Sequence, residues 1–104
     1  MNKISYNTRK LVYEHAISRY GIKPQLLMVI EEMSELAKEI CKFFRGHNNT
    51  EEIAEEVADV TITLEQLRLI FGLNDRVCEI MDEKVRRLAE DRLKLKGWEG
   101  QDNE

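Results

Sequence analysis

Apolar residues recur every three or four positions along most of the chain, which is the spacing typical of amphipathic α-helices. Glycines suited to ending helices interrupt the pattern at Gly21, Gly46 and Gly72, and Gly97 ends it. No stretch shows the strict alternation of apolar and polar residues that predicts a β-strand. The pattern therefore predicts helices over residues 6–20, 24–44, 50–71 and 74–96, followed by a frayed tail over 97–104.

The connections between these predicted helices are short. Pro24 suits the first turn of the second helix, where a backbone N–H has no partner within the helix, and Asn49 or Thr50 can cap the third helix. Short connections favour antiparallel neighbours, and 104 residues fit one domain. We therefore expect an all-α protein in which residues 1–104 form a single domain, a four-helix antiparallel bundle.

One short block of sequence occurs twice with acids at the same places. Residues 30–36 read Ile-Glu-Glu-Met-Ser-Glu-Leu, and residues 54–60 read Ala-Glu-Glu-Val-Ala-Asp-Val. Two acids three residues apart share one helix face, and in both copies this face borders the apolar stripe. Carboxylates are costly to bury unless they are paired or bind a cation. If the two helices face each other, four carboxylates gather at one place: Glu32, Glu35, Glu56 and Asp59.

The chemistry of this cluster narrows the choice of cation. Di-iron sites in helical bundles use Glu-x-x-His motifs, and neither copy of the block contains histidine. An all-oxygen ligand set favours hard cations, here Mg²⁺ with Mn²⁺ as a second choice. Because Mg²⁺ usually takes only one or two carboxylates, four of them suggest room for more than one ion and for a phosphate-bearing ligand. Solvated helix faces are the alternative, but the shared register of acids and apolar neighbours favours a site.

Two parts of the sequence resemble one known family. Glu-Glu-x-x-Glu at 31–35, followed by Glu-x-x-Asp at 56–59, is similar to the signature of the MazG-type all-α nucleoside triphosphate pyrophosphohydrolases. The resemblance covers residues 26–88. It implies an enzyme that hydrolyses a nucleoside triphosphate between the α and β phosphates, with Mg²⁺ as cofactor, to give a monophosphate and pyrophosphate. It also implies a homodimer or a dimer of dimers. The residues to which it assigns metal ligation and catalysis are Glu32, Glu35, Glu56 and Asp59.

The predicted fourth helix extends the resemblance. Asp-Glu-Lys-Val-Arg-Arg at 82–87 is similar to the family's Asn-x-Lys-x-x-Arg segment, in which Lys84 and Arg87 match and Asp82 replaces the Asn. The resemblance implies that Lys84 and Arg87 bind the substrate phosphates. Glu31 lies about 100° around the helix from its neighbour Glu32, so we expect it beside the ligands, where it can orient a water or a basic group.

Two other functions stay open. Phosphoribosyl-ATP pyrophosphohydrolases have a similar acidic layout, but Val-Thr-Ile-Thr follows Asp59 here, where that family would have Leu-Tyr-His. A helical interaction module without catalysis is the other alternative, and metal binding separates it from an enzyme. His15 falls near the apolar side of the first predicted helix, which Leu11 and Val12 mark, so we expect a half-buried structural histidine, with contact to a nucleobase as the alternative.

The composition excludes several classes of partner. Acidic residues outnumber basic ones by 20 to 16, and no basic stripe is present, which argues against a nucleic-acid partner. Cys41 and Cys78 do not have the spacing of a metal site, so we expect reduced thiols. No apolar run approaches the roughly 18 residues that span a bilayer, and the N-terminus lacks a signal-peptide core. These features predict a soluble cytoplasmic protein without a membrane partner.

Overall fold

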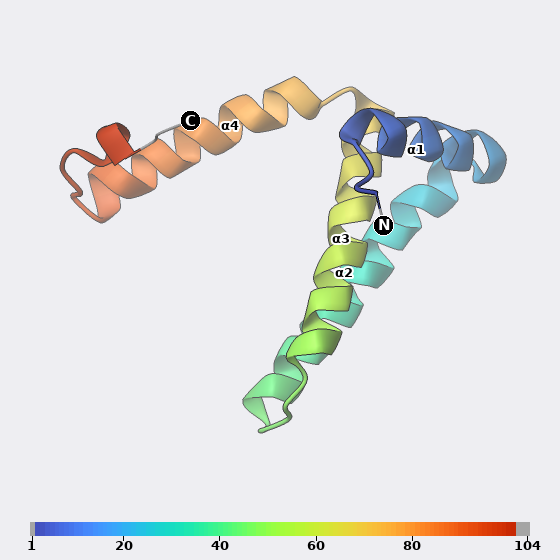
Figure 1. Ribbon diagram of the computed structural model, residues 1–104, viewed down its shortest axis with the longest axis horizontal. Coiled ribbons are helices and arrows are strands. Elements are labelled where there is room, and N and C mark those ends of the chain that lie inside the picture. The colour runs from blue at the N-terminus through green and yellow to red at the C-terminus, as the bar shows by residue number, and fades with distance from the viewer. Residues whose placement is uncertain (1, 102–104) are drawn as a thin grey trace. The chain divides into compact units, whose positions relative to one another are not determined.

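The computed structural model describes residues 2–101 (Figure 1). Four α-helices account for most of them, and no strand occurs among these residues, so the predicted all-α class is confirmed. The sequence predicts one domain, whereas the backbone contacts divide the chain into two compact units, Met1–Gly72 and Leu73–Glu104. Each unit is described by itself. The helices are α1 (Tyr6–Tyr20), α2 (Ile22–Phe44), α3 (Thr50–Phe71) and α4 (Asn74–Arg87), with a π-helical turn η1 (Leu88–Arg92) and a 3₁₀ turn η2 (Trp98–Gln101).

Helices α2 and α3 form an antiparallel hairpin that is the body of the first unit (Figure 1). Near the connecting loop, Asn49 bonds to Glu39. Farther from the loop, Glu32 lies beside Asp59. The residue numbers on α2 therefore fall as those on α3 rise, which is the register of a hairpin with a short connection.

Helix α1 is held against α3 by a charged network. Arg9 donates from Nε to Glu65 Oε1 (3.0 Å) and from Nη2 to Glu65 Oε2 (3.1 Å), and the hydroxyl of Tyr13 also donates to Glu65. Burial, reinforced by the Glu65 carboxylate, raises the pKa of Tyr13 to about 12, so the hydroxyl keeps its proton. At the far end of α1, Gly21 has a φ of 90° that only glycine adopts without strain, and α2 begins at the next residue.

The face that α1 presents to α3 differs from the apolar side that the sequence indicated. Tyr13 is only 4% exposed, whereas Leu11 and Val12 are each 60% exposed. His15 is also exposed rather than half-buried. A bidentate arginine pair and a buried tyrosine therefore outweigh the aliphatic residues in orienting this short helix.

We expect that replacing Glu65 by methionine will lower the melting temperature by about 5–15 °C. A buried hydroxyl that loses its acceptor costs about 1–3 kcal/mol, and each kcal/mol shifts the melting temperature by roughly 4–8 °C in a small domain. The hydrogen bonds from Arg9 lower the pKa of Glu65. The contribution of the charged pair is therefore complete above the unfolded pKa of about 4.3 and is lost as the pH falls through the folded value.

Thermal melts of the wild type and Glu65→Met across the acid range test this, with Tyr13→Phe as the control. Tyr13→Phe leaves the ion pair between Arg9 and Glu65 intact, so its effect should be smaller. The gap between the wild type and Glu65→Met should narrow below about pH 4. A gap that stays constant down to the lowest pH would contradict a stabilising charge on Glu65.

The second unit is a single long helix with a short return. Helix α4 continues into η1 and ends at Arg92, earlier than the predicted Lys96. The N–H of Leu95 donates to the carbonyl of Ala89 (2.9 Å), and Lys94 has a φ of 55°, so the chain turns away at this point. Residues 98–101 of the predicted frayed tail form η2, and residues 102–104 lie outside the described residues.

Much of the apolar surface of the first unit is uncovered. Val29 and Tyr13 are buried, but a hairpin and one short helix do not enclose a core, and several large side chains stay exposed. Ile30 is 67% exposed and Phe44 is 81% exposed. Exposed apolar area on this scale marks surfaces at which proteins associate.

Candidate functional site

Polar residues recur at seven-residue intervals along the seam between α2 and α3. Seven residues make almost two helical turns, so positions with this spacing lie on one face. These positions carry a polar side chain where a coiled-coil seam would be apolar, and apolar residues such as Val29 lie between them. They form three layers, which we name the closed layer (Glu39 and Asn49), the carboxylate layer (Glu32, Glu56 and Asp59) and the amide layer (Gln25, Thr63 and Gln66).

The closed layer, nearest the loop, is held by hydrogen bonds from the Asn49 amide nitrogen, although Asn49 Oδ1 is buried without a partner among the described residues. Asn49 is 6% exposed, and its amide nitrogen donates to the Glu39 carbonyl (2.9 Å) and to Glu39 Oε1 (2.8 Å). Lys42 Nζ lies 3.2 Å from Glu39 Oε2. These contacts, led by the one from Asn49, lower the pKa of Glu39. Asn49 precedes the first residue of α3 as predicted for a cap, but its side chain bonds to α2 rather than to the amides of α3.

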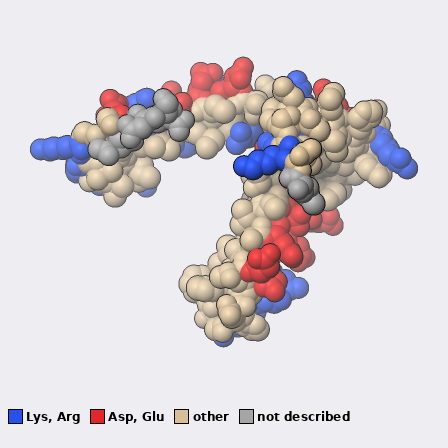
Figure 2. Space-filling view, in the orientation of Figure 1, with Lys and Arg blue, Asp and Glu red and all other residues tan. Residues whose placement is uncertain are grey.

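The carboxylate layer brings together three acids without a neutralising group. Glu32, Glu56 and Asp59 each place one oxygen within 4.8 Å of the others. Burial raises the pKa of Glu32, and the charges of Asp59 and Glu56 raise it further. Burial also raises the pKa of Glu56, again reinforced by Asp59. Glu56 Oε2 is buried and has no hydrogen-bond partner. Acids gather over the middle of the hairpin on the face drawn in Figure 2.

The fourth predicted ligand, Glu35, lies outside this group of three. Its side chain is exposed, although its charge still contributes to the raised pKa of both Glu32 and Glu56. Glu35 lies about 60° around α2 from Glu32, and its side chain faces solvent. Glu31, the predicted helper, is exposed and faces a different, largely apolar pocket.

The amide layer forms a small pocket that adjoins the carboxylates. The pocket has a volume of about 130 Å³. Gln25 is 6% exposed, Thr63 is 3% exposed and Gln66 is 8% exposed. Thr63 Oγ1 donates to the Val60 carbonyl (2.9 Å), whereas neither glutamine amide has a hydrogen-bond partner among the residues that the structure describes. The residues that line the pocket are Gln25, Met28, Glu32, Asp59, Ile62, Thr63 and Gln66.

The sequence analysis missed the amide layer. Its signal was the seven-residue step that leads from Glu32 to Gln25 on α2 and from Asp59 to Gln66 on α3. Glutamine is common on solvated helix surfaces, so this step has no meaning until the hairpin register is known.

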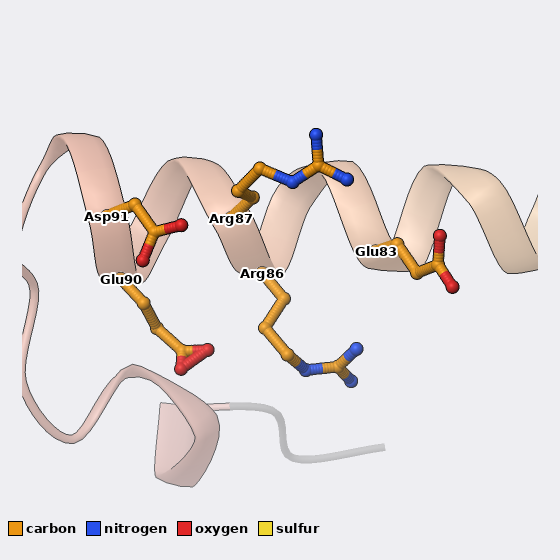
Figure 3. A pocket seen from close by; sticks show the side chains of 5 residues that line it. All are labelled: Glu83, Arg86, Arg87, Glu90 and Asp91. Carbon is orange, nitrogen blue, oxygen red and sulfur yellow. The ribbon is translucent and has the colours of Figure 1, made fainter.

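The two predicted phosphate ligands lie in the second unit. Lys84 and Arg87 line one pocket of about 270 Å³ together with Leu88 and Arg92, so among residues 2–101 three cations and no carboxylate line it. A second pocket of about 280 Å³ has mixed charge (Figure 3). Its lining consists of Glu83, Arg86, Arg87, Glu90 and Asp91.

Figure 3 shows the mixed pocket's arginines pointing to different sides of the helix, with Arg86 and Glu90 on the side of η2. Arg86 Nε also lies 4.0 Å from Glu99 Oε1 on η2. The mixed pocket is therefore balanced by its own acids, and the pocket shared by Lys84 and Arg87 is the one suited to an anion.

Two further findings bear on the class of protein. Among residues 2–101, no helix combines the length and the apolar character needed to cross a bilayer. The chain matches no model of a protein family, no curated protein and no solved structure.

Proposed function

We propose that the protein is a Mg²⁺-dependent nucleoside triphosphate pyrophosphohydrolase, with Mn²⁺ as an alternative cofactor. The observation that carries the proposal is the carboxylate layer, in which Glu32, Glu56 and Asp59 converge across two helices and Glu56 keeps a buried oxygen without a partner. Like charges held this close destabilise the fold unless a cation or protons neutralise them. The arrangement agrees with the MazG-type resemblance of the two acidic motifs.

The donor set fits a hard cation. All three groups offer carboxylate oxygens, which Mg²⁺ and Mn²⁺ prefer. Ligands of octahedral Mg²⁺ lie about 3 Å apart when adjacent and about 4 Å apart when opposite. The oxygens of Glu32, Glu56 and Asp59 lie within 4.8 Å of one another, so small side-chain movements bring them to these separations. Exposed Glu35, at the edge of the cluster, is the remaining proposed ligand.

The proposed reaction assigns a separate task to each group of residues. A bound Mg²⁺ supplies charge neutralisation at the phosphate oxygens and makes water more acidic. Glu32, Glu56 and Asp59 hold the cation, and the protons that the raised pKa values of Glu32 and Glu56 favour are released when it binds. Lys84 and Arg87, whose pocket is lined by no carboxylate from residues 2–101, are the proposed phosphate ligands. Positioning and charge stabilisation then account for most of the acceleration, as is usual for phosphoryl chemistry.

A product assay tests the proposal. Purified protein with Mg²⁺ or Mn²⁺ is expected to release pyrophosphate and a monophosphate from at least one member of a panel of canonical and modified NTPs and dNTPs. Release of orthophosphate alone, or no release from any member, would remove the catalytic assignment and leave the helical interaction module. Phosphoribosyl-ATP belongs in the panel because its pyrophosphohydrolases have a similar acidic layout.

Self-association is a second part of the proposal. The exposed side chains of Ile30 and Phe44 both lie on α2, which already packs against α3 on one side, so its uncovered surface suits another copy of the chain. A homodimer or a dimer of dimers would bury this surface.

A further inference from the structure

We propose that Gln25 and Gln66 form a recognition site for the hydrogen-bonding edge of a nucleobase, and so determine which nucleotide the protein accepts. This inference rests on the proposed function, since it names the part of the substrate that lies beyond the phosphates. Its basis is the amide layer, which none of the acidic motifs includes.

The first argument is the burial of two glutamine residues whose amides line one pocket. Gln25 and Gln66 are 94% and 92% buried, as their exposures of 6% and 8% show. Among the described residues, no hydrogen-bond partner reaches either side-chain amide. The amide atoms themselves are not among the buried atoms without a partner, which are Asn49 Oδ1 and Glu56 Oε2, so they remain accessible from the pocket that they line. Two accessible amides that line one pocket and bond to no other described residue are free to bond to a ligand there.

The second argument is the position of this pocket relative to the acids. Glu32 and Asp59 line it together with the amides, so the pocket opens directly onto the carboxylate layer. Gln25 lies seven residues from Glu32, and Gln66 lies seven residues from Asp59. Seven residues correspond to about 10 Å along a helix. A nucleotide whose phosphates are held at the carboxylates has a sugar to fill this interval and a base to reach the amides.

The third argument is the chemistry that the walls offer. Each glutamine amide has an acceptor oxygen and a donor NH₂ group, which is the combination that proteins use to bind the donor and acceptor of a base edge. Gln25 and Met28 also line an adjoining apolar pocket of about 430 Å³, in which Tyr20, Pro24 and Leu27 offer apolar surface for a flat ring. An uncharged, planar group with adjacent donor and acceptor atoms fits these walls, and a nucleobase has these properties.

Isosteric substitutions separate recognition from structure. Gln25→Met and Gln66→Met keep the length of each side chain and remove its hydrogen bonds. Calorimetric titrations with ATP, GTP, CTP and UTP in Ca²⁺ measure the base preference of binding without requiring turnover. The values of kcat/KM for the same nucleotides in Mg²⁺ measure the base preference of hydrolysis. Thr61→Val, which removes an exposed hydroxyl of α3 that bonds only within its helix, is the control.

We expect each methionine variant to bind the preferred nucleotide about 10- to 100-fold more weakly and to lose most of the discrimination between bases. The melting temperature without ligand should stay close to that of the wild type, because neither amide bonds to another described residue. The stabilisation by Mn²⁺ alone should persist. The Thr61→Val control should keep both its preference and its turnover.

The outcomes distinguish this inference from the proposed function. Turnover without base preference in the wild type, or a preference that survives both substitutions, overturns the role of the amides and leaves the hydrolase intact. A general loss of stability in both variants would show that the amides are structural, and it too overturns the inference. Selective binding that requires Gln25 and Gln66 without any pyrophosphate release supports the recognition site and removes the catalytic assignment.

Discussion

Replacing Glu56 by glutamine will lower kcat/KM for nucleoside triphosphate hydrolysis by about 100-fold or more while the metal-free protein melts at the same temperature or higher. An amide keeps the shape of the side chain but loses the charge that holds a cation. Glu56 combines a raised pKa with a buried oxygen that has no partner, so loss of its charge also relieves repulsion from Asp59. Steady-state kinetics test the expected loss of turnover, and a thermal melt on the same preparation tests the expected stability.

The same pair of results is expected for Glu32→Gln and Asp59→Asn, because both residues belong to the carboxylate layer. Glu51→Gln is the matched control, since Glu51 is an exposed acid in the first turn of the same helix, α3, away from the layer. Full turnover in the layer variants, or unfolding of all three, would mean that these acids serve the fold.

Millimolar Mn²⁺ or Mg²⁺ will raise the melting temperature by about 10 °C near neutral pH and by much less near pH 5. A ligand at about 100 times its dissociation constant stabilises a small domain by an amount of this size. The raised pKa values of Glu32 and Glu56 set the pH dependence. A carboxyl whose folded pKa exceeds its unfolded pKa contributes stability below the unfolded value, and this contribution is lost as the pH rises through the folded value.

The metal-free protein should therefore lose stability relative to a Glu32→Gln/Glu56→Gln double variant as the pH rises from the acid range to neutrality. Metal binding opposes this loss, and it weakens at acid pH because protons compete for the same oxygens. Thermal melts at the two pH values, with and without metal, measure both effects. A metal-induced shift that is equal at both pH values, or that persists in the double variant, would place the ion elsewhere.

The periodicity of the sequence was sufficient for the helices, because amphipathic spacing and helix-ending glycines are local signals. The periodicity was less informative about which face of each helix packs against the other helices. Helix α1 illustrates the difference: Leu11 and Val12 suggested an aliphatic contact, but the contact is made by Arg9 and Tyr13 with Glu65, a residue far away in the chain. No local rule identifies the one acid on another helix that will complete such a network.

The candidate site, too, was predictable from the sequence only in part. The repeated block aligned Glu32 with Glu56 and Glu35 with Asp59, and this pointed to the residues of the carboxylate layer. In the hairpin Glu32 gathers with both Glu56 and Asp59, whereas Glu35 is exposed. Asn49 was predicted as a helix cap, yet its amide joins the two helices. Register between helices is a tertiary property, and one sequence does not display it.

The polar seam of the α2–α3 hairpin implies a conflict between stability and activity. A seam of this geometry filled with leucine and isoleucine would bury apolar surface along its whole length and would be far more stable. The present chain instead places clustered acids, and glutamines whose amides have no partner among the described residues, at several positions of this seam. Substitutions selected only for thermostability should therefore accumulate at these positions, and the protein should lose its activity as they accumulate. The polar residues that such a selection replaces would be the ones that the function requires.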